Sequence, residues 1–218
     1  AAAVDDGRRL RATLDRRRAA SQQFFATAAG QWDRLREDLF GDTFHLWALL
    51  GLIDSTLTVG DLGCGTGQLT ETVAPFVRRV IAVDASRDML VAAHKRLADL
   101  RNVEIREGDL EGLPLRDEEL DAALLSLVLH HSPDPARTLA EVARVCRPGA
   151  TVLVVDMLPH HHEEYRQQMG HVWLGFTEPQ VVKLLIGAGF EDVRVRSLPV
   201  DRDARGPALF AALARRGK

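Results

Sequence analysis

The stretch VGDLGCGTGQLTE, residues 59–71, places three glycines on alternate positions between an apolar run and an amphipathic pattern. Glycine allows close backbone approach and conformations that other residues avoid. In an open α/β sheet, the turn from the first strand into the next helix offers backbone N–H groups to a ligand. We therefore expect a ligand over Gly63, Gly65 and Gly67, beside Asp61, although glycine turns also serve tightness alone.

Downstream of this turn, strand-like and helix-like segments alternate. We predict strands near 57–61, 79–84, 102–106, 120–127, 150–156, 191–197 and 207–214, and helices near 67–76, 86–99, 135–147, 160–171 and 177–187. This alternation predicts a Rossmann-like α/β fold, with a seven-stranded, mostly parallel sheet and helices on both faces. A polar loop separates the last two strands, so an antiparallel last strand is expected at the edge.

The start of the chain has a different pattern. Residues 1–41 are predicted to form an N-terminal helical arm or linker, and residues 42–218 a single ligand-binding domain. Apolar and small residues recur at helical spacing from Leu10 to Leu39, with a break expected at Gly30, and another helix is expected near Asp42. The arm's arginines suit either a solvated linker or a nucleic-acid contact. Its apolar stripe could pair two chains into a homodimer.

The composition narrows the class of protein. A chain of 218 residues, 46% of them hydrophobic, can bury one sizeable core. A formal net charge of -3 gives no overall attraction to nucleic acid or to an anionic membrane. No apolar run approaches the roughly 20 residues that span a bilayer, and the start lacks a signal-peptide pattern. With only Cys64 and Cys146, far apart, these features favour a cytoplasmic protein without disulfides.

The spacing of the glycines separates two kinds of ligand. A dinucleotide fingerprint would need a third glycine at position 68, which is Gln68. An acid at the strand end, here Asp61, would repel a pyrophosphate and suits a cation. Asp84 ends the next apolar run, RRVIAVDAS, where a carboxylate can accept hydrogen bonds from ribose hydroxyls. Because that acid fits both kinds of cofactor, a nicotinamide-dependent oxidoreductase stays as a disfavoured alternative.

Taken in order, the segments from Val59 to Asp156 resemble class I S-adenosylmethionine (SAM) methyltransferases. The matching motifs are D-x-G-x-G-x-G at 61–67, GDL at 108–110, LHH-x-x-D-P at 129–135 and RVCRPGA at 144–150, where Cys146 and Ala150 replace the usual Leu and Gly. The resemblance implies a turn of Gly63, Gly65 and Gly67 under the amino-acid part of SAM, with Asp61 at its ammonium, Asp84 at the ribose, and Asp109 and Leu110 at the adenine.

The flanking segments resemble narrower groups. LHH-x-x-D-P is similar to the small-molecule branch, which includes quinone-biosynthesis C-methyltransferases. SQQFFATAAGQWDRLREDLFGD (21–42) and YRQQMGHVWLGFTEPQVVKLLIGAGF (165–190) resemble the methyltransferase module fused to arsenic-repressor-type winged-helix regulators in bacteria. In that arrangement DNA contact would come only from a winged-helix module, which this sequence does not contain. We therefore expect either a piece of such a regulator or a free-standing relative.

The predicted function is transfer of a methyl group from SAM to a small-molecule acceptor, leaving S-adenosylhomocysteine. In-line displacement needs positioning in a dry pocket and no metal. An acidic acceptor would also need a general base, for which His130 and His131 are candidates, although both could instead cap a helix. An alternative is a non-catalytic domain of a transcriptional regulator that senses SAM or S-adenosylhomocysteine.

Residues outside the motifs are assigned by their place in the chain. His160, Tyr165, Arg166 and His171 follow the fifth strand and are expected to contact the acceptor. By resemblance, Trp32 of the arm is expected to fold over the cofactor with Phe25, unless these rings only pack within the arm. The run His160–Glu163 is not expected to bind metal, because consecutive side chains on a helix point in different directions.

Overall fold

The computed structural model describes residues 2–41, 43–201 and 203–218. The chain divides into two compact units, Ala1–Leu50 and Gly51–Lys218. The boundary expected between residues 41 and 42 stays a prediction, and Asp42 lies outside the described residues. Among the described residues, no helix combines the length and the apolar character that crossing a membrane requires.

The first unit is helical, with α1 (Ala2–Ala28), η1 (Ala29–Gln31), α2 (Trp32–Phe40) and α3 (Phe44–Leu50). The predicted break at Gly30 is confirmed, because a 3-10 turn there separates the first two α-helices. The rings of Phe24, Phe25 and Trp32 contact one another across this turn, with centroids 5.1 to 6.2 Å apart. Leu10 and Leu14 are exposed on α1, and pairing of two chains through them stays a prediction.

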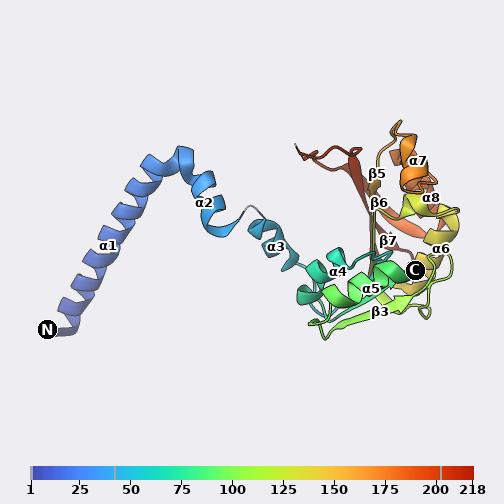
Figure 1. Ribbon diagram of the computed structural model, residues 1–218. Coiled ribbons are helices and arrows are strands. Elements are labelled where there is room, and N and C mark those ends of the chain that lie inside the picture. Colours follow the sequence, from blue (N-terminus) through green and yellow to red (C-terminus); the bar gives the residue numbers. More distant parts are fainter. Residues whose placement is uncertain (1, 42, 202) are drawn as a thin grey trace. The chain divides into compact units, whose positions relative to one another are not determined.

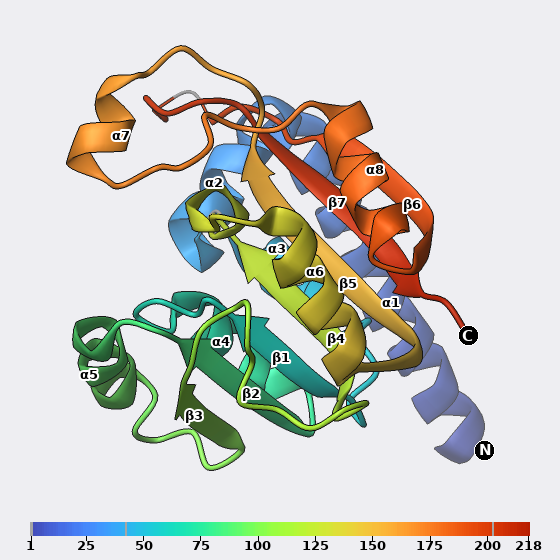
Figure 2. The ribbon, with the colours of Figure 1, turned by 90° about the vertical axis from the view of Figure 1, so that its right-hand side faces the viewer.

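The second unit is built on a seven-stranded sheet (Figures 1 and 2). The strand order is β3-β2-β1-β4-β5-β7-β6. The first five of these are parallel, whereas β7 runs antiparallel to both β5 and β6, which confirms the predicted mixed sheet. The strands are β1 (Thr58–Leu62), β2 (Arg79–Asp84), β3 (Val103–Glu107), β4 (Leu120–Ser126), β5 (Cys146–Met157), β6 (Phe190–Ser197) and β7 (Leu209–Arg216).

Apolar residues on both faces of the sheet explain the nearly continuous apolar runs in its strands. Successive residues of β2 belong to opposite clusters: Val80 packs with Val59 and Val73, and Ile81 with Leu139 and other buried residues. Alternate side chains of a strand point to opposite faces, so a strand buried on both sides must be apolar throughout. Figure 2 shows α6 (Pro135–Val145) and α8 (Glu178–Gly187) together on the viewer's side of the sheet.

The remaining helices are α4 (Gln68–Val73), η2 (Ala74–Phe76), α5 (Arg87–Arg96), η3 (Leu129–His131) and α7 (Glu164–Gln168). Ser86 caps α5, since its side chain accepts from the amide of Met89. Thr177 forms a capping box with Gln180 at the start of α8. Such caps satisfy N–H groups that lack a partner in the first turn of a helix.

Two predicted helix boundaries are wrong. The helix expected over 160–171 is only Glu164–Gln168, because the amide of His160 donates instead to the carbonyl of Leu174 and the chain turns at Gly170, with φ +71°. The helix expected over 135–147 ends at Val145, and β5 begins at Cys146, four residues earlier than predicted. Cys146 pairs with Leu120 of β4, so strand pairing determines that boundary.

Candidate active site

The glycine turn joins β1 to two other parts of the sheet. Gly63 has φ +83°, and a Cβ there would lie 2.4 Å from Cγ2 of Val128 in the segment after β4. The amides of Gly63 and Cys64 both donate to the carbonyl of Val83 in β2, at 2.7 and 2.9 Å. A side chain at position 63 would therefore force apart the segments that close the carboxyl edge of the sheet.

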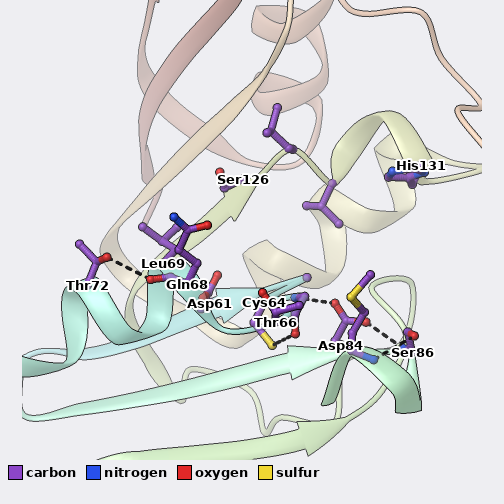
Figure 3. Close-up of a pocket in the computed structure, with 15 residues that line it drawn as sticks. Asp61, Cys64, Thr66, Gln68, Leu69, Thr72, Asp84, Ser86, Ser126 and His131 are labelled. Carbon is purple, nitrogen blue, oxygen red and sulfur yellow. Dashed lines mark hydrogen bonds between the residues drawn. The ribbon is translucent and has the colours of Figure 1, made fainter. Parts of the chain in front are cut away.

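A Cβ atom added at Gly65 would enter open space, whereas one added at Gly63 would contact Val128. The φ of Gly65 is +52°, no other heavy atom lies within 4 Å of a Cβ built there, and its amide donates to Oδ2 of Asp84 at 2.8 Å. Gly65 lines a cavity of about 670 Å³ at the carboxyl ends of β1, β2 and β4 (Figure 3). Ligand pockets typically measure about 300–1,000 Å³. The lining residues are Asp61, Gly63, Cys64, Gly65, Thr66, Gln68, Leu69, Thr72, Asp84, Ser86, Met89, Ser126, Leu127, Val128 and His131.

Asp61 is a buried acid at the base of this cavity. Its side chain accepts a hydrogen bond from Thr70 of α4, and the residue is 1% exposed. Burial raises the pKa of Asp61 to about 6, the hydrogen bonds from Thr70 oppose the increase, and the negative charge of Asp84 adds to it. Among the described residues, neither acid has a basic side chain as an ion-pair partner, so a cation is the ligand charge that both lack.

Asp84 lies where two cavities meet. Its Oδ1 accepts from the amide of Ser86 at 2.8 Å, and its Oδ2 holds the amide of Gly65. A neighbouring cavity of about 190 Å³ is also lined by Asp84 and contains both Asp109 and Leu110. The Oδ1 atom of Asp109 accepts from the amide of Glu111, in a turn that presents this segment to the cavity. The structure thus brings together all of the strand-tip residues that the sequence predicted for the cofactor.

The segment after β4 forms the opposite wall. Leu127 has φ +54°, a left-handed conformation that costs a residue with a side chain about 1–2 kcal/mol. Its amide donates to the carbonyl of Val155 at 2.8 Å, which holds this bend against β5. His131 lines both cavities and lies across the larger one from Asp61 in Figure 3. Strain beside a cavity is common at binding sites, and no sequence pattern marked Leu127.

His130 lines neither of the two cavities and is buried in the protein. It is 3% exposed, its Nδ1 lies 2.8 Å from Oδ1 of Asp156, and its amide donates to Oδ2 of the same carboxylate. Asp156 belongs to β5 and is fully buried. Asp156 was not predicted as a site residue, although an acid at the end of the apolar run VLVVD was a usable signal. The catalytic roles of His130 and His131 stay predictions.

The other predicted acceptor residues gather behind His131. The ring of His171 lies 4.3 Å from that of His130 and 5.1 Å from that of His131, between centroids. Burial lowers the pKa of His171 to about 4 and also lowers the pKa of His131 and His160. Tyr165 lies against His171, at 5.3 Å. None of these lines either cavity except His131, and their contact with an acceptor stays a prediction.

Arg166 and Trp173, near the cluster, hold neighbouring segments in place. Arg166 forms an ion pair with Glu163 and donates to the carbonyl of Val172, so it braces its own segment. Trp173 donates from Nε1 to the carbonyl of Ser132 at 2.9 Å. Trp32 belongs to the first unit, and its contact with a cofactor stays a prediction.

The fold and the cavity define a class of protein. The strand order reverses direction between β1 and β4, and the glycine turn lies at this switch point on the carboxyl edge of the sheet. Open α/β sheets bind nucleotide-containing cofactors at such points. The absence of lysine and arginine among the described residues that line the larger cavity fits a cationic cofactor better than a pyrophosphate.

Comparisons with known proteins agree with this class. Residues 60–154 match a family described as a methyltransferase domain. A Streptomyces fradiae protein, described as an uncharacterized 37.1 kDa protein in a transposon, is 43% identical over 97 residues, which cover 43% of this chain and 28% of that protein. The demethylmenaquinone methyltransferase of Staphylococcus saprophyticus is 28% identical, over 79% of this chain and 88% of the relative.

A solved structure shows the same fold. The S-adenosylmethionine-dependent methyltransferase from Mesorhizobium loti aligns with a TM-score of 0.66 and 22% identity, covering 80% of this chain and 97% of the other. Residues 60–154 thus resemble a methyltransferase domain in sequence, and the fold is that of a SAM-dependent class I methyltransferase. The chain spans just over a quarter, 28%, of the length of the Streptomyces protein.

Proposed function

We propose that this domain transfers a methyl group from SAM to a small-molecule acceptor and releases S-adenosylhomocysteine. The observation that carries the proposal is the pair Asp61 and Asp84, two acids at the tips of adjacent strands beside a cavity of about 670 Å³. Within the part of the chain that the structure describes, neither acid has a basic ion-pair partner. SAM brings a sulfonium and an ammonium group to such a site. A positive charge beside Asp61 would lower its raised pKa and stabilise the carboxylate.

The two cavities suggest how SAM would lie. Its amino-acid end would occupy the larger cavity over Gly65 and Asp61, and its ribose would meet Asp84, which both cavities share. The adenine would then reach the smaller cavity beside Asp109 and Leu110. This arrangement would direct the sulfonium methyl group towards Ser126 and His131 on the opposite wall.

The chemistry follows from this placement. An acceptor atom attacks the methyl carbon in line with the departing sulfur, and the bond to sulfur breaks as the new bond forms. Alignment of the two reactants supplies much of the rate enhancement. His131 is the group best placed to take a proton from the acceptor, because it lines both cavities and its lowered pKa leaves the ring neutral near pH 7.

A quinone-type ring is the acceptor class with the best support. The Staphylococcus saprophyticus relative, which aligns over 79% of this chain, is named as a demethylmenaquinone methyltransferase. Methylation of such a ring carbon removes a proton from that carbon, which requires a base on the acceptor side. The LHH-x-x-D-P segment, by which the sequence resembles the quinone branch, contains His131.

The test has two stages. Calorimetric titration of the full chain with SAM should give a dissociation constant in the micromolar range, with NADH as a control that does not bind. The chain is then incubated with SAM and a reduced demethylmenaquinone analogue of short tail, and S-adenosylhomocysteine is measured by mass spectrometry. No binding at millimolar SAM would refute the proposal. Binding of SAM without turnover of any acceptor tried would instead favour the sensing domain of a regulator.

A further inference from the structure

Two consecutive histidines and a third that is distant in sequence meet behind the acceptor wall. His130 and His131 lie on η3, and His171 follows α7 some forty residues later. Each offers a ring nitrogen, and these atoms all lie within 4.8 Å of one another. Tetrahedral zinc with Zn–N bonds of 2.0–2.1 Å separates its nitrogen ligands by about 3.4 Å. Small rotations of the rings would therefore bring all three into coordination distance of one ion.

The hydrogen bonds around the cluster are those expected of metal ligands. A histidine that binds a metal through one ring nitrogen usually donates from the other to a carboxylate or a backbone carbonyl. His130 has its Nδ1 at 2.8 Å from Oδ1 of buried Asp156, and His131 has its Nδ1 at 3.4 Å from the carbonyl of Gly170. The Nε2 atom of each ring is then left for an ion.

His171 supplies an independent observation. The residue is 7% exposed, and its Nδ1 atom is buried without a hydrogen-bond partner. Buried polar atoms without a partner are rare in proteins and cost about 1–3 kcal/mol. Nε2 of His160, whose ring centroid lies 6.5 Å from that of His171, is also buried and unpartnered. An ion in the cluster would satisfy the lone pair of His171.

The segments that carry the cluster are held together by other contacts. The carbonyl of His130 accepts from the amides of Val172 and Trp173, at 3.1 and 3.0 Å. Trp173 also bonds the carbonyl of Ser132 through its ring. The cluster is thus assembled by the fold before any ion binds, which lowers the conformational cost of binding.

We infer that His130, His131 and His171 form a binding site for one divalent transition-metal ion of the zinc class, beside the cofactor cavity. Imidazole is a preferred ligand of zinc, and three protein ligands leave a fourth position open. Because His131 also lines both cavities, an ion bound to it would lie next to them. The inference stands on the cluster and does not depend on the proposed methyl acceptor.

A metal in this site would change the role of His131. Its lone pair would bind the ion, so His131 would no longer accept a proton. An ion with an open position would instead polarise an oxygen of the acceptor, as Lewis-acid metals do in other enzymes. Spacing along the chain pointed only to the consecutive residues His160–Glu163 as candidate metal ligands, because no local pattern links residues 130 and 171.

The test measures zinc binding directly. Tag-free full chain is stripped with a chelator and titrated with Zn²⁺ against a chromophoric competitor. One equivalent should bind with micromolar or tighter affinity. His171→Ala and His131→Ala should each weaken binding at least about a hundredfold, and Asp156→Asn by about 10–100-fold, the range known for partners of metal-bound histidines. His131 is the second variant because it is less buried than His171, so its replacement disturbs the core less.

A matched control separates this site from the neighbouring run of histidines. His161 is exposed and lies in that run, so His161→Ala should leave the affinity for Zn²⁺ unchanged. The inference is overturned if the wild-type chain binds no zinc, or if His161→Ala weakens binding while His171→Ala does not. Titration with SAM, with and without chelator, is the separate measurement: unchanged SAM affinity in a chain that binds no zinc would leave the proposed function standing.

Discussion

The cofactor side and the histidine side of the cavity are built in opposite ways. The cofactor side comes chiefly from residues 59–86, in which one strand, one turn and one helix lead to the tip of the next strand. The histidine side joins residues near 130, 156 and 171, from η3, β5 and the segment after α7. The spacing of a local motif is enough to form the cofactor side. The histidine side forms only when three segments that are distant in sequence pack together.

The largest effect should come from Gly63, which packs against Val128 in the segment that leads to the histidine side. Gly63→Ala introduces a Cβ 2.4 Å from Cγ2 of Val128 at φ +83° and should lower the free energy of unfolding by about 2–4 kcal/mol. Gly65→Ala, at φ +52° in open space, should lower it by only about 1–2 kcal/mol. Urea denaturation measures both. Equal losses would show that the close approach to Val128 is unimportant.

The next effect is a pH dependence that belongs to the cofactor side. Asp61 has an ordinary pKa of 3.8, raised to about 6 in the fold, so between these values the folded state binds a proton that the unfolded state has lost. Stability should therefore fall as pH rises from about 4 to about 6, by at most roughly 3 kcal/mol.

Asp61→Asn should remove this fall, because an amide has no such titration and can still accept from Thr70. Denaturation midpoints of the two proteins, compared across about pH 4–8, provide the measurement. If the midpoints of the wild type and of Asp61→Asn change in parallel across this pH range, Asp61 is not the group that causes the pH dependence. In the wild type, SAM should bind more tightly above about pH 6, where Asp61 is more readily ionised.

Asp84→Ala should lower the affinity for SAM and leave the histidine side unchanged. It removes the acceptor for the amide of Gly65 and, in the proposed pose, the acceptor for the ribose hydroxyls. SAM affinity should fall at least about tenfold by calorimetry, the order expected for a charge-assisted hydrogen-bond pair. Asp84→Asn keeps one side-chain oxygen as an acceptor, so its affinity for SAM should fall less than that of Asp84→Ala. Unchanged affinity in the alanine variant would remove Asp84 from the site.

The smallest effect should come from the histidine side. Trp173→Phe removes the bond from Nε1 to the carbonyl of Ser132 and should lower the free energy of unfolding by about 1 kcal/mol, with SAM affinity unchanged. Trp47 has similar exposure, 44% against 39%, and Trp47→Phe in the first unit is the control. A loss of SAM affinity in Trp173→Phe would show that the two sides are not separable.

Local patterns predicted most of the fold correctly. The helices predicted over 86–99 and 177–187 start where Ser86 and Thr177 cap them, because a cap depends on a few adjacent residues. The strand β2 was predicted because its central run VIAV is apolar throughout. The wrong element boundaries lie where hydrogen bonds to residues distant in sequence determine the local structure. Cys146 extends β5 because it pairs with Leu120, and His160 stays outside a helix because its amide bonds Leu174.

By itself, the sequence determined the alternating elements, the glycine turn and the acids Asp61 and Asp84 at two strand tips, because spacing along the chain fixes which side chains reach the carboxyl edge of a parallel sheet. Only the tertiary structure placed His171 beside His130 and set Asp156 behind them. Those contacts join residues far apart in the chain, and no local periodicity encodes which distant segments will pack together.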